Sequence, residues 1–142
     1  MAPKAAKMQP FSIRLGPEAD RLVAAEIRRT GRSRSVVVEE LTEEAAKSRL
    51  HPGVAFRGMP RRAWVIGSGL DVWEIVALER SYKGDENLLR KSHALLTLGH
   101  LRAARAYSRQ FPEEIEQLIA ENQRPIEELQ ALYPFVQVAD AR

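Results

Sequence analysis

A single alternating strand pattern near the N-terminus constrains this chain most, because no second strand follows it. Residues 10–15 read Pro-Phe-Ser-Ile-Arg-Leu, and a two-residue period separates their side chains into two faces. The apolar face carries Phe11, Ile13 and Leu15, and the other carries Pro10, Ser12 and Arg14. An unpaired strand exposes backbone N–H and C=O groups, and no hairpin turn supplies a partner. We therefore expect the same strand of a second copy to complete an antiparallel two-chain ribbon.

Two helical patterns follow the strand directly, over residues 16–30 and 33–49. Gly16-Pro17 opens the first, because proline at the first helical position loses no hydrogen bond, and Gly31 ends it. The apolar residues at helical spacing are Leu22, Val23 and Ile27, then Val37, Val38, Leu41 and Ala45. A strand and two helices bury little in one chain, so we expect folding and dimerisation to be coupled.

The order strand, helix, Gly31-Arg32-Ser33-Arg34-Ser35, helix resembles the ribbon-helix-helix family of dimeric DNA-binding proteins over residues 9–49. The resemblance implies that alternate ribbon residues read bases in the major groove, while the start of the second helix holds a backbone phosphate. Residues 1–8 would form a flexible basic arm. Matched by position, the base contacts are Ser12 and Arg14, and the phosphate contacts are Ser33, Arg34 and Ser35. Lys7 of the basic arm is a further expected phosphate contact. Pro10, at the remaining ribbon position, cannot hydrogen-bond to a base.

The chemistry of these residue types supports the same roles. An arginine fork can bond O6 and N7 of one guanine, and a serine hydroxyl can donate or accept at several base edges. A helix start exposes N–H groups and a partial positive charge, which suit a phosphate oxygen. The simpler interpretation is that Arg14 is a solvated strand residue and Ser33 only a helix cap.

Composition limits the remaining classes of protein. The 142 residues suffice for one medium domain or two small ones, and 44% of them are hydrophobic. With no cysteine, the chain has no disulfide and no thiolate zinc site. No stretch resembles an export signal or approaches the roughly 18 apolar residues of a membrane span. We therefore expect a cytoplasmic protein with no membrane partner.

Charge is distributed unevenly along the chain, whose net charge is +3. Residues 1–49 hold 10 Lys/Arg and 7 Asp/Glu, residues 50–111 hold 10 and 5, and residues 112–142 hold 2 and 7. A basic front and middle suit a polyanion, and an acidic end suits a basic protein partner. Solvated faces would produce a similar distribution.

His51-Pro52-Gly53 marks a boundary, because proline and glycine together end a helix. The residues that follow predict a small helical module with a β-hairpin over residues 52–121. The expected elements are strands at 54–56 and 63–66, and helices that begin at Asp71, near Leu88, at Thr97 and at Pro112. We therefore expect a mainly α fold with short β elements, in which a ribbon-helix-helix unit precedes this module.

This module resembles a helix-turn-helix-like family of small proteins commonly encoded beside toxins with a PIN-like nuclease fold. The residues that carry the resemblance are Gly67, 71–76, Leu96-Thr97, Arg102-Ala103-Ala104, Tyr107 and 112–115. The resemblance implies an antitoxin role and brings no catalytic motif.

The helix expected over 97–110 gives a second candidate nucleic-acid surface. Arg102, Arg105 and Arg109 share one of its faces at spacings of three and four. Docked as a helix-turn-helix, that face would contact phosphates or a groove. The alternative is a solvated basic face, or one that meets the acidic C-terminal helix of the same molecule. The aromatic residues expected in the core are Trp64, Trp73 and Tyr107.

Residues 122–142 are a candidate segment for binding a protein partner. Their apolar anchors are Ile126, Leu129, Leu132, Tyr133 and Phe135. An amphipathic segment of this kind can lay its anchors in a groove of a nuclease toxin. Packing on its own domain or on the dimer mate is an equal alternative, and a frayed end is a further one.

We expect no catalytic activity, metal or cofactor. The three histidines, His51, His93 and His100, share no metal-ligand spacing with a carboxylate pair, and no glycine-rich phosphate cradle is present. The sequence thus predicts a homodimeric, sequence-specific DNA-binding transcriptional repressor of the type II antitoxin kind, whose C-terminal region could neutralise a PIN-like toxin. The alternative is a stand-alone transcriptional regulator or architectural DNA-binding protein with no toxin partner.

Overall fold

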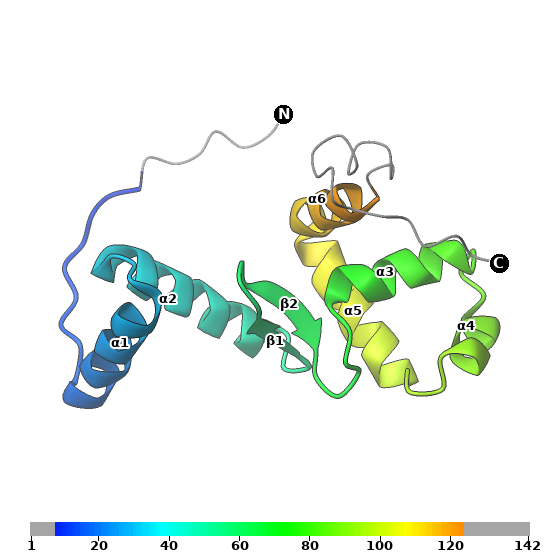
Figure 1. Ribbon diagram of the computed structural model, residues 1–142, viewed down its shortest axis with the longest axis horizontal. Helices are drawn as coiled ribbons and strands as arrows, with labels where there is room; N and C mark the ends of the chain where they lie inside the picture. Colours follow the sequence, from blue (N-terminus) through cyan, green and yellow to red (C-terminus); the bar gives the residue numbers. More distant parts are fainter. Residues whose placement is uncertain (1–7, 124–142) are drawn as a thin grey trace, which may run out of the picture. The chain divides into compact units, whose positions relative to one another are not determined.

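The computed structural model describes residues 8–123, which form a mainly helical fold with one small antiparallel sheet (Figure 1). The chain divides after Glu43 into two compact units. We call residues 8–43 unit 1 and residues 44–123 unit 2. Helix α2, Arg34–Leu50, contributes residues to both. The expected fold class, mainly α with short β elements, is confirmed at this level.

Unit 1 contains helix α1, Pro17–Thr30, and the first part of α2. Gly16 is the N-cap of α1. Gly31 ends the helix with a left-handed backbone, φ 68°, and its N–H donates to the Ile27 carbonyl at 2.8 Å. Ser33 caps α2, because its Oγ accepts a hydrogen bond from the Val36 N–H at 3.4 Å. Both predicted helices are confirmed, together with the residues that start and end them.

The strand expected at residues 10–15 has no regular secondary structure in the single chain. A β-ladder requires a second strand, and residues 8–43 contain none. Phe11 is 83% exposed and Ile13 is 64% exposed. The two-chain ribbon therefore stays a prediction.

Unit 1 buries few apolar side chains. Among residues 8–43, only Val23 and Val37 are buried. In the single chain, Leu22 of α1 and Leu41 of α2 are exposed although they belong to the expected apolar stripes, and so is Ala45, in the part of α2 that belongs to unit 2. Two helices without further elements can enclose only a narrow stripe of each other, so the rest of a wider apolar stripe stays open.

Unit 2 continues from α2 into a β-hairpin and further helices. Strand β1, Val54–Arg57, pairs antiparallel with β2, Arg62–Val65, and Val54 lies opposite Val65. The helices that follow are α3, Val72–Ser81, α4, Glu86–Ser92, α5, Leu98–Gln110, and α6, Pro112–Asn122. Local signals place these elements, since Thr97 Oγ1 accepts from the His100 N–H at 3.1 Å and so caps α5. The predicted hairpin and helices are confirmed.

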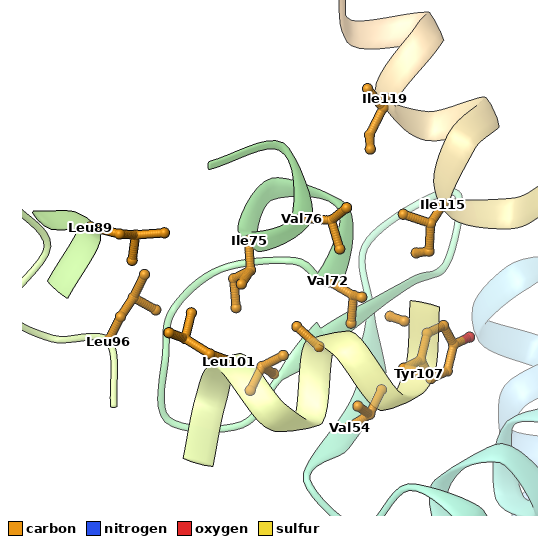
Figure 2. Close-up of a cluster of buried hydrophobic side chains, with 13 residues drawn as sticks. Val54, Val72, Ile75, Val76, Leu89, Leu96, Leu101, Tyr107, Ile115 and Ile119 are labelled. Carbon is orange, nitrogen blue, oxygen red and sulfur yellow. The ribbon is translucent and has the colours of Figure 1, made fainter. Parts of the chain in front are cut away.

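One hydrophobic core holds unit 2 together (Figure 2). Helix α3 packs on α5 and α6, and the hairpin packs on α5 and α3. The buried side chains are Val54, Ala63, Val65, Val72, Ile75, Val76, Leu89, Leu96, Leu101, Ala104, Tyr107, Ile115 and Ile119. Tyr107 is fully buried, as expected, and Trp73 packs at the edge of the core. Trp64 is half-buried, with the Arg57 guanidinium 4.6 Å from its ring centre.

The last turns of α2 belong to unit 2, and charged and aromatic contacts hold them to the hairpin and to the start of α6. Arg61 Nε donates to Glu44 Oε1 at 2.8 Å. Lys47 Nζ lies 4.6 Å from the centre of the Phe111 ring and 3.3 Å from Glu114 Oε2. These partners are far apart in sequence, so helical periodicity gives no signal for them.

Asp71 joins the hairpin to the start of α3. Its side chain is buried, and its two oxygens accept hydrogen bonds from Arg57 Nε at 3.0 Å and Arg62 Nε at 2.8 Å. Its backbone N–H donates to Glu74 Oε2 at 2.7 Å, as in a capping box. The sequence predicted Asp71 as a helix cap. The structure adds that its carboxylate is the shared counter-charge of two arginines, which a buried charge requires.

Replacing Asp71 with asparagine removes this charge but keeps a residue type that caps helices well. We expect Asp71→Asn to lower the free energy of unfolding by roughly 2 kcal/mol, less than for a fully buried pair because both arginines reach solvent. Asp85→Asn is the control, because Asp85 caps α4 at an exposed position. A change below about 0.5 kcal/mol is expected there. Urea unfolding followed by circular dichroism measures both, and equal effects would contradict the role given to the ion pairs.

Candidate nucleic-acid interface

The predicted base contacts lie in the N-terminal residues of unit 1. Ser12 and Arg14 are exposed. Arg14 has no hydrogen-bond or ion-pair partner in the part of the chain that the structure describes. Both side chains are therefore accessible to a ligand.

The predicted phosphate contacts of α2 are consecutive, so the helix start brings them together. Ser33, Arg34 and Ser35 are all exposed. The Ser33 hydroxyl is occupied as the helix cap, whereas the Arg34 guanidinium is held by Asp20 of α1, with Nη2 at 2.5 Å from Oδ1. No sequence signal indicates Asp20 as the partner of Arg34, because the carboxylate that meets Arg34 depends on how α1 and α2 are arranged.

Most arginines of unit 1 are paired with a carboxylate. The pairs are Glu18 with Arg21, Glu26 with Arg29, Arg32 with Glu40 and Asp20 with Arg34. Hydrogen bonding to Arg21 lowers the pKa of the Glu18 carboxyl. Arg28 is the one arginine of α1 with no partner within residues 8–123. Arg14 and Arg28 are therefore the arginines of unit 1 whose charge no carboxylate compensates there.

Unit 1 also exposes much of its apolar surface. The large apolar side chains that are exposed in residues 8–43 are Met8, Phe11, Ile13, Leu22, Val36 and Leu41. Single exposed apolar residues are normal on a soluble protein. Here they outnumber the buried ones of the same unit, which is typical of a surface that another chain covers.

The three arginines predicted as a second nucleic-acid surface all lie on α5 but differ in their partners. Arg105 Nε donates to Glu79 of α3 at 2.9 Å, and its Nη2 donates to Glu86 of α4 at 2.9 Å. These hydrogen bonds, the one to Glu79 first, raise the pKa of Arg105. Arg109 Nε donates to the Arg105 carbonyl at 3.3 Å, and Arg102 is exposed. Arg105 therefore joins three helices, whereas Arg102 and Arg109 are both exposed.

A pocket of about 570 Å³ lies in unit 2 between the hairpin, the start of α3 and the end of α6. It is lined by charges of both signs, among them Arg62, Asp71 and Glu121. Because Asp71 already binds both arginines of the pocket, its lining indicates no single class of ligand. In residues 8–123, no group of three or more His, Asp or Glu residues could hold a metal ion. Within the same range no helix is both long and apolar enough to cross a membrane.

Several predicted residues lie outside the described residues. They are Lys7 of the basic arm, and Ile126, Leu129, Leu132, Tyr133 and Phe135 of the C-terminal segment.

Comparison of the chain with family models, curated proteins and solved structures found no match. The roles of the residues above therefore depend on their own chemistry and placement, and on the two resemblances drawn from the sequence.

Proposed function

We propose that the chain is a homodimeric, sequence-specific DNA-binding transcriptional repressor of the type II antitoxin kind that acts in the cytoplasm. In this proposal, residues 10–15 of two copies form an antiparallel ribbon, Ser12 and Arg14 read bases, and Ser33, Arg34 and Ser35 contact the DNA backbone. The observation that carries the proposal is the exposed apolar surface of unit 1.

The exposed residues 10–15 support a ribbon because their two faces differ in chemistry. Phe11 and Ile13, both largely exposed, alternate with Ser12 and Arg14. Pairing with a second copy would satisfy the backbone N–H and C=O groups and place both apolar side chains on one face. The opposite face would then present two copies of Ser12 and Arg14 to a ligand.

Burial in a dimer would also complete the core that one chain lacks. Full burial of an apolar side chain such as Phe, Ile or Leu stabilises a fold by about 1.5–3 kcal/mol. Phe11, Ile13, Leu22 and Leu41 are all available for it in each copy. Covering them would contribute as much as the stability of many small domains.

The antitoxin part of the proposal comes from the resemblance over residues 52–121 and from the acidic, apolar composition of residues 122–142. If residues 122–142 bind a toxin, unit 1 remains free to bind DNA. The alternative, a stand-alone or architectural DNA-binding protein, needs no toxin. A small PIN-like protein that is encoded beside this chain and co-purifies with it would support the antitoxin role, whereas a chain that binds DNA without such a neighbour would favour the alternative.

Dimerisation can be tested at Phe11, which is 83% exposed in the single chain. Because the Phe11 side chain is mostly exposed in one chain, Phe11→Lys should leave the stability of a monomer unchanged. We expect the wild-type protein to be a dimer in sedimentation equilibrium and the variant to be a monomer at the same concentration, with a lower melting temperature. Leu95→Lys is the matched control, since Leu95 of unit 2 is 81% exposed, and we expect no change there. A wild-type chain that is monomeric at all concentrations would refute the ribbon.

Base reading can be tested at Ser12 and Arg14. Sites are first selected by the wild-type protein from a pool of random DNA duplexes. We expect the double variant Ser12→Ala, Arg14→Ala to bind the selected site at least about tenfold more weakly at fixed salt, because each lost base contact is worth about 1–3 kcal/mol. Arg28→Ala removes another unpaired arginine and should preserve the sequence preference. Unchanged affinity of the double variant would overturn the assignment.

A further inference from the structure

The ion pair between Asp20 and Arg34 differs from the neighbouring pairs of unit 1. Asp20 belongs to the first turn of α1 and Arg34 is the first residue of α2, so the pair connects two helices. Arg34 Nη2 lies 2.5 Å from Asp20 Oδ1, and the two side chains are 53% and 55% exposed. A pair this exposed contributes little to stability, and either side chain can leave it at small cost.

Arg34 is also a predicted phosphate contact. A carboxylate offers a guanidinium group the same kind of charged oxygen acceptor that a phosphate offers. The two acceptors therefore compete for one side chain. If Arg34 turns to a phosphate, the Asp20 carboxylate loses its partner and stays close to a second negative charge.

We propose that Asp20 is an internal competitor for the DNA phosphate that Arg34 contacts, and that it lowers the affinity of the protein for the DNA backbone. This inference rests on the proposed DNA-binding function. Because backbone contacts are the same for every sequence, Asp20 would weaken binding to all DNA equally and leave the base preference to Ser12 and Arg14. Each copy in a dimer carries one such pair.

The matched control for Asp20 is Glu18. Both are exposed acids in the first turn of α1, where a negative charge interacts favourably with the helix dipole. Glu18, however, is paired with Arg21 of the same helix, at 2.5 Å, and not with α2. Asp20→Asn and Glu18→Gln therefore remove the same charge from the same turn, and differ in whether Arg34 is released.

The experiment measures binding of the full-length protein to a fluorescently labelled, mixed-sequence DNA duplex by anisotropy at low salt. We expect Asp20→Asn to bind up to about fivefold more tightly than wild type, because binding then no longer breaks one exposed ion pair. Glu18→Gln should change the affinity by less than about twofold, because Glu18 pairs with Arg21 and does not hold Arg34. In an Arg34→Ala background, Asp20→Asn should give no gain, and raising the salt should reduce the gain in the native background.

The outcomes separate the inference from the function on which it rests. If wild type binds DNA and Asp20→Asn behaves like Glu18→Gln, or gains as much without Arg34, the competitor role is overturned while DNA binding stands. If neither wild type nor any variant binds the duplex, the DNA-binding proposal falls, and the inference with it. Circular dichroism of each variant checks that the helices are retained.

Discussion

Unit 1 cannot cover its own apolar side chains, and this constraint favours a second chain that covers them. Two helices and a non-regular N-terminal stretch enclose Val23 and Val37 but leave Phe11, Ile13 and Leu41 in water. Apolar surface of this extent is stable when another chain covers it. An N-terminal stretch with one apolar and one polar face can supply that cover and present polar side chains outward in the same step.

Unit 2 follows the opposite principle, because it completes its core within one chain. Its hairpin and helices surround a single cluster of buried side chains. Charged residues then connect the elements at the periphery of that core: Asp71 holds two arginines of the hairpin, and Arg105 joins α5 to α3 and α4. A basic residue in this unit can therefore be a structural group, even where its spacing suggests a nucleic-acid surface.

The same distinction applies to the cations of unit 1. Exposed ion pairs are weak in water, so an arginine held by an exposed carboxylate remains available to a stronger acceptor. Arg34 is such a residue, whereas Arg14 has no carboxylate partner within residues 8–123 that it would have to leave. A DNA-binding surface built in this way would combine unpaired side chains with side chains that must first leave an ion pair.

The amino-acid sequence by itself determined the helices and the hairpin of this protein. Gly31, Ser33, Thr97 and Pro112 act through the backbone within a few residues of their own position, and the helices start and end where they predict. The roles of Ser12 and Arg14 as base contacts stay predictions, since both faces of residues 10–14 are exposed in the single chain.

Only the tertiary structure decided which side chains meet across elements. The burial of Asp71 between Arg57 and Arg62, the capture of Arg105 by Glu79 and Glu86, and the pairing of Asp20 with Arg34 all join residues from different elements. It also decided that Leu22, Leu41 and Ala45 stay exposed in one chain. Local signals cannot predict these outcomes, because charge pairing and burial depend on the arrangement of elements in space, whereas caps and turns depend on the neighbouring backbone.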